Sequence, residues 1–253
     1  MRKNITAGID VGTHVTRVAI IEHMPNGEEK IIGFGSTLTK GMRRGYITNI
    51  DDVSNCIKES IGLAEAMSGV KVKRGYVSIG GVGMEGFTAI GSAIVSKADQ
   101  EVTNLDVSKA TEEAEKNINL INKRVIHSLP ISYKLDGKEV FGKPEGMIGV
   151  RLEVKILFIT INKQHLEDLV TAVATAGIEV LDVIASPFAS STLLLSDQQK
   201  AAGCALVDIG AESVTLSIFE NGVPISLQVF QIGGLDITKD IALGFKVSLD
   251  EAE

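Results

Sequence analysis

The sequence has no tryptophan, only two cysteines and few aromatic residues, and it contains no long uninterrupted hydrophobic run. Cys56 and Cys204 lie far apart without CxxC or Cys/His spacing, which excludes a disulfide framework and a zinc site. Aromatic residues make up 4% and the net charge is −7, which argues against a nucleic-acid-binding surface. The longest uncharged apolar stretch, residues 183–196, is interrupted by Pro187 and is shorter than the roughly 18 residues of a membrane span.

The N-terminus is basic, but Asp10 interrupts its apolar stretch before a signal-peptide core can form. We therefore expect a cytoplasmic protein. With 253 residues, 44% of them apolar, the chain can bury the core of one large domain or two modest ones.

One short pattern occurs twice, as AGIDVGTHVTRVAI at residues 7–20 and as ALVDIGAESVTLSIF at residues 205–219. With an offset of 198, Asp10 meets Asp208 and Gly12 meets Gly210. Each copy alternates apolar and polar residues, reaches a Gly- or Asn-containing turn and resumes as another strand, which predicts two hairpin units. Two copies so far apart indicate two related halves of one protein, and a solenoid would need a much shorter period.

The segments between the copies predict helices and further strands. Residues 51–67 have helical apolar spacing with Asp51 or Asp52 as N-cap, and residues 162–177 form a clearer helix with Asn162 as N-cap and Gly177 as stop. Residues 154–161 are almost continuously apolar, as in a strand buried on both faces of an α/β sheet, and a further helix begins near Pro187. The middle segment, with a polar helix from Asp106 between short strands, predicts a small inserted α+β subdomain.

An Asp-x-Gly turn between two strands can present backbone N–H groups to an anion, because glycine lets the chain approach a phosphate closely. Two such turns facing one another could hold a polyphosphate from both sides. The aspartates would then lie beside the phosphates, where they could hold Mg²⁺ through water. A single Asp-x-Gly is common in ordinary hairpins; two copies in matching strand contexts are a stronger signal.

At these residues the chain resembles the actin/Hsp70/hexokinase ATPase superfamily, whose two phosphate hairpins look like IDVGTHVTRVAI and VDIGAESVTLSIF. More narrowly, it resembles the FtsA family of bacterial cell-division proteins. Three segments carry the narrower resemblance: residues 31–61, RVIHSLPISYKLDG at residues 124–137, and QIGGLDITKDIALGF at residues 231–245.

The resemblance implies an α/β protein with the actin-like ATPase fold, two ribonuclease-H-like halves and a small inserted α+β subdomain, the second half being incomplete. Residues 1–83 would be the first part of domain I (subdomain IA, with the first phosphate hairpin), and residues 84–155 the inserted subdomain (1C, SHS2-like). Residues 156–200 would complete subdomain IA, and residues 201–253 would start domain II (IIA, with the second phosphate hairpin). The adenosine-binding segment, the part where FtsZ docks and a C-terminal amphipathic membrane helix would lie beyond Glu253, so we expect a truncated member.

The site residues follow from the same resemblance. Asp10 and Asp208 would hold Mg²⁺, and Thr13 would contact a phosphate through its hydroxyl. In the second hairpin the family commonly has DIGGGT where this chain has DIGAES, so a carboxylate occupies the turn and would repel a phosphate unless it points away. The expected phosphate-binding residues are Gly12, Thr13, His14, Gly210, Ala211, Glu212, Gly233 and Gly234.

For function, the resemblance implies a cell-division protein that, when complete, binds ATP and Mg²⁺, forms filaments at the cytoplasmic face of the inner membrane, tethers FtsZ and recruits later division proteins. At most a weak ATPase is expected, with binding by this chain weak or undetectable, and no catalytic residue is named; His127 has no partner at catalytic spacing. Two alternatives on the same fold are a pilus-assembly relative of FtsA (PilM-like) and a sugar-kinase-like phosphotransferase. The sequence shows no sugar-binding set for the latter, and the combination of HSLPISYKLDG with GGLDITKDIA favours FtsA over the former.

Overall fold

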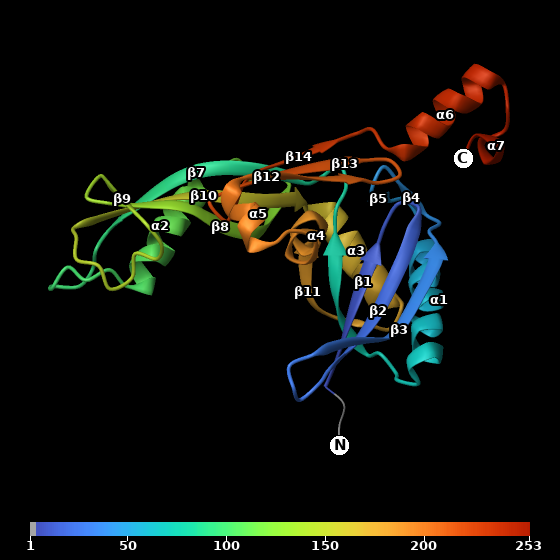
Figure 1. Cartoon of the computed structure of the whole chain (residues 1–253), viewed down its shortest axis with the longest axis horizontal. Coiled ribbons are helices and arrows are strands. Elements are labelled where there is room, and N and C mark those ends of the chain that lie inside the picture. Colours follow the sequence, from blue (N-terminus) through green and yellow to red (C-terminus); the bar gives the residue numbers. More distant parts are fainter. Residues whose placement is uncertain (1–3) are drawn as a thin grey trace.

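A five-stranded sheet forms the body of the molecule in the computed structural model, which describes residues 4–253 (Figure 1). The strand order is β11-β6-β1-β2-β3, with β1, β2 and β3 antiparallel and β1, β6 and β11 parallel. Helices α1 and α3 share the core on one face of this sheet. The bounds are β1 Ile5–Val11, β2 Val15–His23, β3 Glu29–Leu38, β6 Arg74–Ile79, β11 Glu179–Ala185, α1 Ile50–Ser68 and α3 Lys163–Thr175.

Helix α1 lies directly on the backbone of β3. A Cβ atom added at Gly35 would lie 1.9 Å from the Ser60 carbonyl oxygen, so a glycine is needed for this approach. The helix begins two or three residues earlier than its acidic residues suggested: its N-cap is Asn49, whose side chain accepts from the N–H groups of Asp51 and Asp52. The expected cap at Asp51 or Asp52 was wrong, because these carboxylates occupy the first turn, where they face the positive end of the helix dipole.

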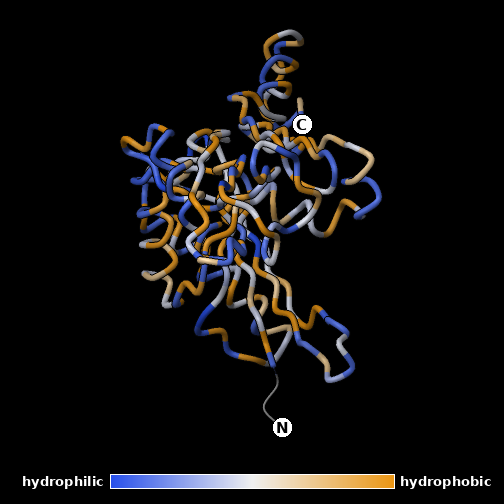
Figure 2. The backbone as a smooth tube through the Cα atoms, turned by 90° about the vertical axis from the view of Figure 1, so that its left-hand side faces the viewer, coloured by the Kyte–Doolittle hydropathy of each residue, from blue (hydrophilic) through white to orange (hydrophobic). Residues whose placement is uncertain are grey.

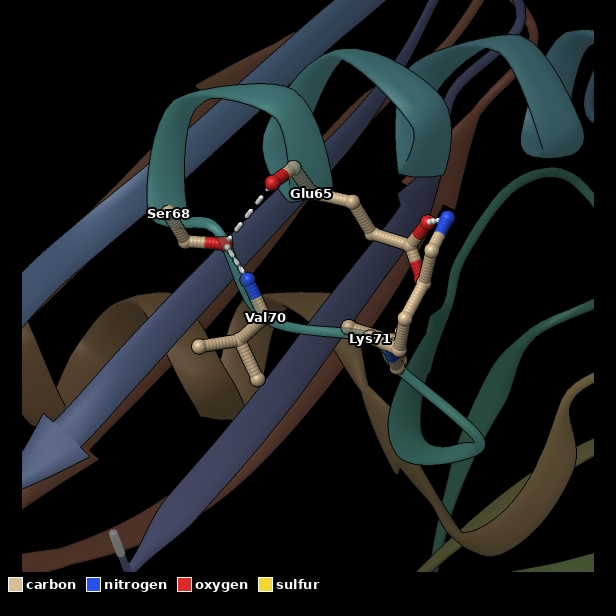
Figure 3. Close-up of polar contacts among 5 residues, drawn as sticks. Glu65, Ser68, Val70 and Lys71 are labelled. Carbon is tan, nitrogen blue, oxygen red and sulfur yellow. Dashed lines mark hydrogen bonds and ion pairs between the residues drawn. The ribbon is translucent and has the colours of Figure 1, made fainter.

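The C-terminal end of α1 is fixed by the loop that leads to β6 (Figure 3). Gly69 has a φ of 69° and ends the helix in the left-handed conformation. The Val70 N–H donates to Ser68 Oγ at 3.2 Å, and the Val72 N–H donates to Glu65 Oε1 at 2.7 Å. Lys71 pairs with the same Glu65 carboxylate.

A short hairpin, β4 Met42–Arg43 and β5 Tyr46–Ile47, connects β3 to α1. Its two turn residues, Arg44 and Gly45, have φ values of 52° and 79°, as in the primed turns that suit two-residue hairpins. Gly45 approaches the Gly80–Gly81 segment so closely that a Cβ on Gly45 would lie 2.8 Å from the Gly81 Cα. The hairpin is thereby held at the end of β6.

The expected inserted α+β subdomain is an antiparallel four-stranded sheet, β7-β10-β8-β9, with α2 packed on one face (Figure 1). Its helix begins at Asn104, two residues before the expected Asp106, which is instead buried in the first turn and accepts from the Thr103 N–H. Gly91 allows the close contact of α2 with the sheet. The bounds are β7 Glu85–Ile94, α2 Asn104–Lys116, β8 Lys123–Leu135, β9 Lys138–Val140 and β10 Arg151–Asn162.

Strand β10 joins the inserted subdomain to the body. Val154, Ile156 and Phe158 pack in the core beneath α2, whereas Leu157 and Ile159 pack in the main core. The strand is therefore buried on both faces, as its apolar run predicted, although its sheet is antiparallel. The strand also continues through the position between residues 155 and 156 at which the sequence placed a domain boundary.

The second copy of the repeated pattern forms a separate three-stranded sheet, β12-β13-β14. The expected Asn221-Gly222 turn has φ values of 51° and 83° at its two residues, as a primed turn requires. Helix α6 follows and projects from the body (Figures 1 and 2). Several of its apolar side chains are exposed, including Leu243 and Phe245. The bounds are α4 Ser186–Leu194, α5 Asp197–Ala202, β12 Cys204–Ile209, β13 Val214–Glu220, β14 Val223–Phe230, α6 Gly234–Phe245 and α7 Leu249–Ala252. None of the helices within residues 4–253 has the length and apolar character needed to cross a membrane.

Candidate nucleotide-binding cleft

The two turns of the repeated pattern line one cavity of about 590 Å³. In the first turn the Gly12 N–H donates to the Val15 carbonyl, and in the second the Gly210 N–H donates to the Ser213 carbonyl. These are equivalent bonds at an offset of 198, so the sequence repeat is also a repeat of local structure. A Cβ on Gly12 would lie 2.8 Å from the accepting oxygen, closer than real Cβ contacts, and a Cβ on Gly210 would lie 3.0 Å from it, a tight contact.

Several backbone N–H groups of these turns are free to bind an anion. Those of Thr13, His14 and Ala211 have no acceptor among the residues that the structure describes. All three residues line the cavity. Unpaired N–H groups in a glycine-containing turn form a concave anion site, so the arrangement can bind a phosphate without a dedicated basic side chain.

Asp10 and Asp208 both line the cavity and interact electrostatically. Partial burial raises the pKa of Asp208, and the neighbouring Asp10 carboxylate raises it further. Asp10 also accepts from the Ser78 hydroxyl and lies 3.8 Å from an Arg17 guanidinium nitrogen. Two carboxylates that repel one another at one cavity are suited to sharing a cation.

The donor set fits a magnesium ion that keeps most of its water. The described residues contain no group of three or more His, Cys, Asp or Glu side chains placed to hold a metal directly. Mg²⁺ is usually bound through one or two carboxylates together with waters and substrate phosphates. Asp10 and Asp208 could supply that pair of carboxylates.

Glu212 and Gly233 are not among the residues that line the cavity, unlike the other expected site residues. The Glu212 carboxylate points to the β4–β5 hairpin and accepts from the Arg44 N–H. Gly233 lies behind the second turn, where a Cβ would be 2.4 Å from the Ala211 carbonyl oxygen. Its role is therefore to let α6 start against this turn.

The start of α6 is bonded to the second turn. The Gly234 N–H donates to the Gly210 carbonyl and the Leu235 N–H donates to the Ala211 carbonyl, both at 2.9 Å. These bonds satisfy two of the N–H groups that the end of a helix otherwise leaves unpaired. The amides of the turn, rather than those of α6, are the ones left to receive a ligand.

The sequence reasoning missed Arg17, Ser186 and the Gly80–Gly81 segment, all of which line the cavity. Arg17 could have been found, because the register of a hairpin closed at residues 12–15 places it opposite Asp10. Gly80 and Ser186 had no such signal. They follow β6 and β11, and only the parallel pairing of β11 with β6 and of β6 with β1 brings them to the cavity.

Comparison with known proteins identifies the relatives of this arrangement. Residues 84–160 match the family model described as SHS2 domain inserted in FTSA, and residues 205–253 match that of cell division protein FtsA. The chain is 34% identical to the cell division protein FtsA of Bacillus subtilis over 245 residues, covering 97% of this chain and 56% of that protein. It is 30% identical to FtsA of Borreliella burgdorferi over 253 residues, covering 100% of this chain and 61% of that protein.

Among solved structures, a chain of the PilM-PilN type IV pilus biogenesis complex superposes with a TM-score of 0.70 at 18% identity, covering 98% of this chain and 67% of that one. This likeness concerns the fold alone, and the FtsA relatives decide between the two expected families. The expected fold is confirmed. The chain is a homologue of the cell division protein FtsA, with the actin-like ATPase fold and the inserted SHS2 subdomain, and it spans about 60% of the length of the FtsA proteins that it matches.

Proposed function

We propose that this chain binds the phosphates of ATP together with Mg²⁺ in the cleft between its two repeated turns. The observation that carries the proposal is the convergence of two equivalent Asp-x-Gly turns on one cavity, with unpaired N–H groups in both. The N–H groups of Thr13 and His14 would bind from one side and that of Ala211 from the other, in turns that Gly12 and Gly210 close. Asp10 and Asp208 would hold Mg²⁺ through water, and the ion would neutralise phosphate charge.

Arg17 would supply a positive side chain to the same cavity. It lies opposite Asp10 on β2 and is about half exposed, so its guanidinium can reach the ligand as well as the carboxylate. Guanidinium groups recognise phosphate oxygens well because they offer several N–H donors in one plane. A bound Mg²⁺ would compete with Arg17 for the Asp10 carboxylate. Arg17 would then be free to bind the phosphates.

Recognition of the base would be weak in this chain. The residues that line the cavity include no phenylalanine, tyrosine or tryptophan that could stack on adenine. The entropy cost of binding remains while these contacts are missing, so we expect a low affinity governed by the triphosphate. Glu212 does not line the cavity and its carboxylate is directed to the Arg44 N–H, which reduces its repulsion of the ligand.

As an FtsA homologue, the protein would act in cell division as an assembly component. It would polymerise at the cytoplasmic face of the membrane at the division site, tether FtsZ and recruit later division proteins. The nucleotide would serve as a regulatory ligand, with slow hydrolysis at most. The relatives support a role in cell division, whereas the cleft supports the nucleotide part of the proposal.

Isothermal calorimetry tests whether the cleft binds the phosphates of ATP together with Mg²⁺. Mg²⁺-ATP and Mg²⁺-triphosphate should both bind, adenosine should not, and removing Mg²⁺ should weaken ATP binding. Asp208→Asn should abolish the effect of Mg²⁺, whereas Asp197→Asn, at the start of α5 outside the cavity, should behave as the wild type. No binding of Mg²⁺-ATP at millimolar concentration, or equal binding by Asp208→Asn, would overturn the proposal.

A further inference from the structure

Two histidines that the proposed ligand does not contact lie behind one wall of the cleft. His127 on β8 accepts the Ala185 N–H through Nε2 at 3.1 Å. His165 on α3 is 3% exposed, and its Nε2 donates to the Gly80 carbonyl at 3.2 Å. A carbonyl only accepts and a backbone N–H only donates, so His165 carries its proton on Nε2 and a neutral His127 carries its proton on Nδ1.

The two segments that these histidines hold are in contact with each other. Ser186, the residue after Ala185, donates its hydroxyl to the Ile79 carbonyl at 3.2 Å. A Cβ on Gly80 would lie 2.4 Å from Ser186 Oγ. Gly80 and Ser186 both line the cavity, so a shift of either one changes the shape of the cleft.

His127 belongs to the inserted subdomain, whereas His165 lies on α3 of the body. Strand β8 belongs to the sheet of the inserted subdomain, where Val125 and Tyr133 pack in the core beneath α2. Leu129 and Ile131 of the same strand pack against the main core. The strand is therefore fixed at both ends, and a displacement of the inserted subdomain moves His127 with it.

The surroundings of His127 keep its ring in one position and in its neutral form. The ring packs on Phe188 of α4, with the ring centres 5.2 Å apart. On β10 its partner is the apolar Ile159. From β11 the charged group that acts on it is Asp182, which raises its pKa, but burial has the larger effect and lowers the pKa below the ordinary value.

We propose that His127 is a positioning residue through which the inserted subdomain sets the position of the Ser186–Gly80 wall of the cleft. Its neutral ring accepts the Ala185 N–H, fixes the start of α4 and so holds Ser186 against Gly80. A partner that displaces the inserted subdomain, or protonation of His127, releases this wall. The consequence for ligand affinity rests on the proposed function, whereas the positional coupling does not.

Amide NMR of the full chain tests the coupling without a ligand. His127→Phe keeps the ring contact with Phe188 but removes the acceptor, and His127→Gln restores an acceptor at the position of Nε2. We expect faster exchange of the Ala185 amide and shifted Ser186 and Gly80 signals in His127→Phe, and wild-type behaviour in His127→Gln. His23→Phe, at the end of β2 away from the cleft, is the control.

Should His127→Phe fail to fold, acid titration of the wild type and of His127→Gln provides the same test. The Ser186 and Gly80 signals should move together with the titration of His127, and in His127→Gln this movement should be absent. Ser186 and Gly80 signals that stay in place while His127 titrates, or that are unchanged in a folded His127→Phe, overturn the coupling.

Binding of Mg²⁺-ATP separates the two proposals. We expect His127→Phe to bind about fivefold more weakly than His127→Gln, the lower end of coupling between sites. Coupled NMR signals without any binding by the wild type would refute the nucleotide proposal and leave the positioning role in place. Equal affinity in both variants despite coupled signals would refute the effect of His127 on the ligand.

Discussion

The carboxylate of Glu212, in the second turn, accepts a hydrogen bond from the backbone N–H of Arg44, in the β4–β5 hairpin. The two residues are 168 positions apart in the chain and come from the two halves that face the cleft. This bond explains how a carboxylate can occupy a turn for which we propose phosphate binding: the Glu212 carboxylate points to the hairpin and joins the two sides of the cavity. Substitutions of Glu212 and Arg44 therefore test this contact and the hairpin turn.

Removing the Glu212 acceptor should loosen the hairpin. In Glu212→Ala the Arg44 amide loses its partner, and a net hydrogen-bond contribution of about 1 kcal/mol corresponds to roughly fivefold faster hydrogen exchange. Glu212→Gln keeps an acceptor oxygen and should exchange at nearly the wild-type rate. Equal rates in all three proteins would show that the bond does not hold the hairpin in solution.

Arg44 itself is a site for stabilisation. Its φ of 52° is unfavourable for an arginine, and asparagine tolerates this conformation better at the first position of a primed turn. Arg44→Asn retains the backbone N–H and should raise the free energy of unfolding by about 0.5 kcal/mol. Urea unfolding measures the change, and Arg43→Asn, on strand β4, is the matched control in which no gain is expected.

The glycines of β3 and α1 should respond oppositely to alanine. Gly35→Ala would place a methyl group 1.9 Å from the Ser60 carbonyl oxygen, so α1 must move away from the sheet at a cost of about 3 kcal/mol or more. Gly62→Ala meets no atom within 4 Å and should stabilise the protein by about 1 kcal/mol through helix propensity. Thermal unfolding of the two variants should show melting temperatures on either side of the wild-type value.

Asp106 should make the inserted subdomain sensitive to acid. Burial alone would raise its pKa, but hydrogen bonds from Thr103 and Ser96 overcome this effect and lower the pKa to about 2. The unfolded chain binds the proton more readily, so the stabilisation is complete above the ordinary value of 3.8 and is lost as the pH falls toward 2.

Asp106→Asn should cost about 2 kcal/mol at neutral pH, because the charge-assisted bonds are lost, and it should flatten the acid limb of the stability curve. An unchanged acid limb in this variant would assign the acid sensitivity to other carboxylates. Asp99→Asn, an exposed change between β7 and α2, serves as the control.

His165, which is buried, and His127, which is partly buried, predict a second pH effect nearer neutrality. Burial lowers the pKa of both His127 and His165 below 6.5, so each takes up a proton more readily in the unfolded chain. Stability should be complete above about pH 6.5 and fall as the pH decreases from there toward the lowered values. Denaturant unfolding at a series of pH values should show this decline in the wild type and a shallower one in His127→Gln.

The parts of the fold that local sequence determines were predictable. The hairpin turn at Asn221-Gly222, the Asn162 cap and the start of α4 near Pro187 each depend on the conformational preferences of one or two residues, and the structure confirms them. The cap of α1 and the start of α2 were misplaced because acidic residues near the start of a helix can act as caps or as first-turn charges. Asn49 and Thr103 occupy the cap positions instead.

The site was predictable only where it is repeated. The offset between the two copies led to Asp10 and Asp208, which line one cavity. Gly80 and Ser186 reach this cavity through pairing between strands distant in the chain, which no local pattern encodes. The orientation of Glu212 was likewise inaccessible, because its partner is a backbone N–H that any residue at position 44 other than proline would offer.

Strand β10 has a mechanical consequence. Its 12 residues extend for roughly 40 Å at about 3.3 Å per residue, and they lie between the two cores without a loop, with alternate side chains packed in each core. A joint of this kind resists bending and has no hinge residue about which the smaller subdomain could swing freely. The inserted subdomain is thus rigidly connected to the body: a force applied at its far end tilts β10, the strand that both cores share, and so reaches the body.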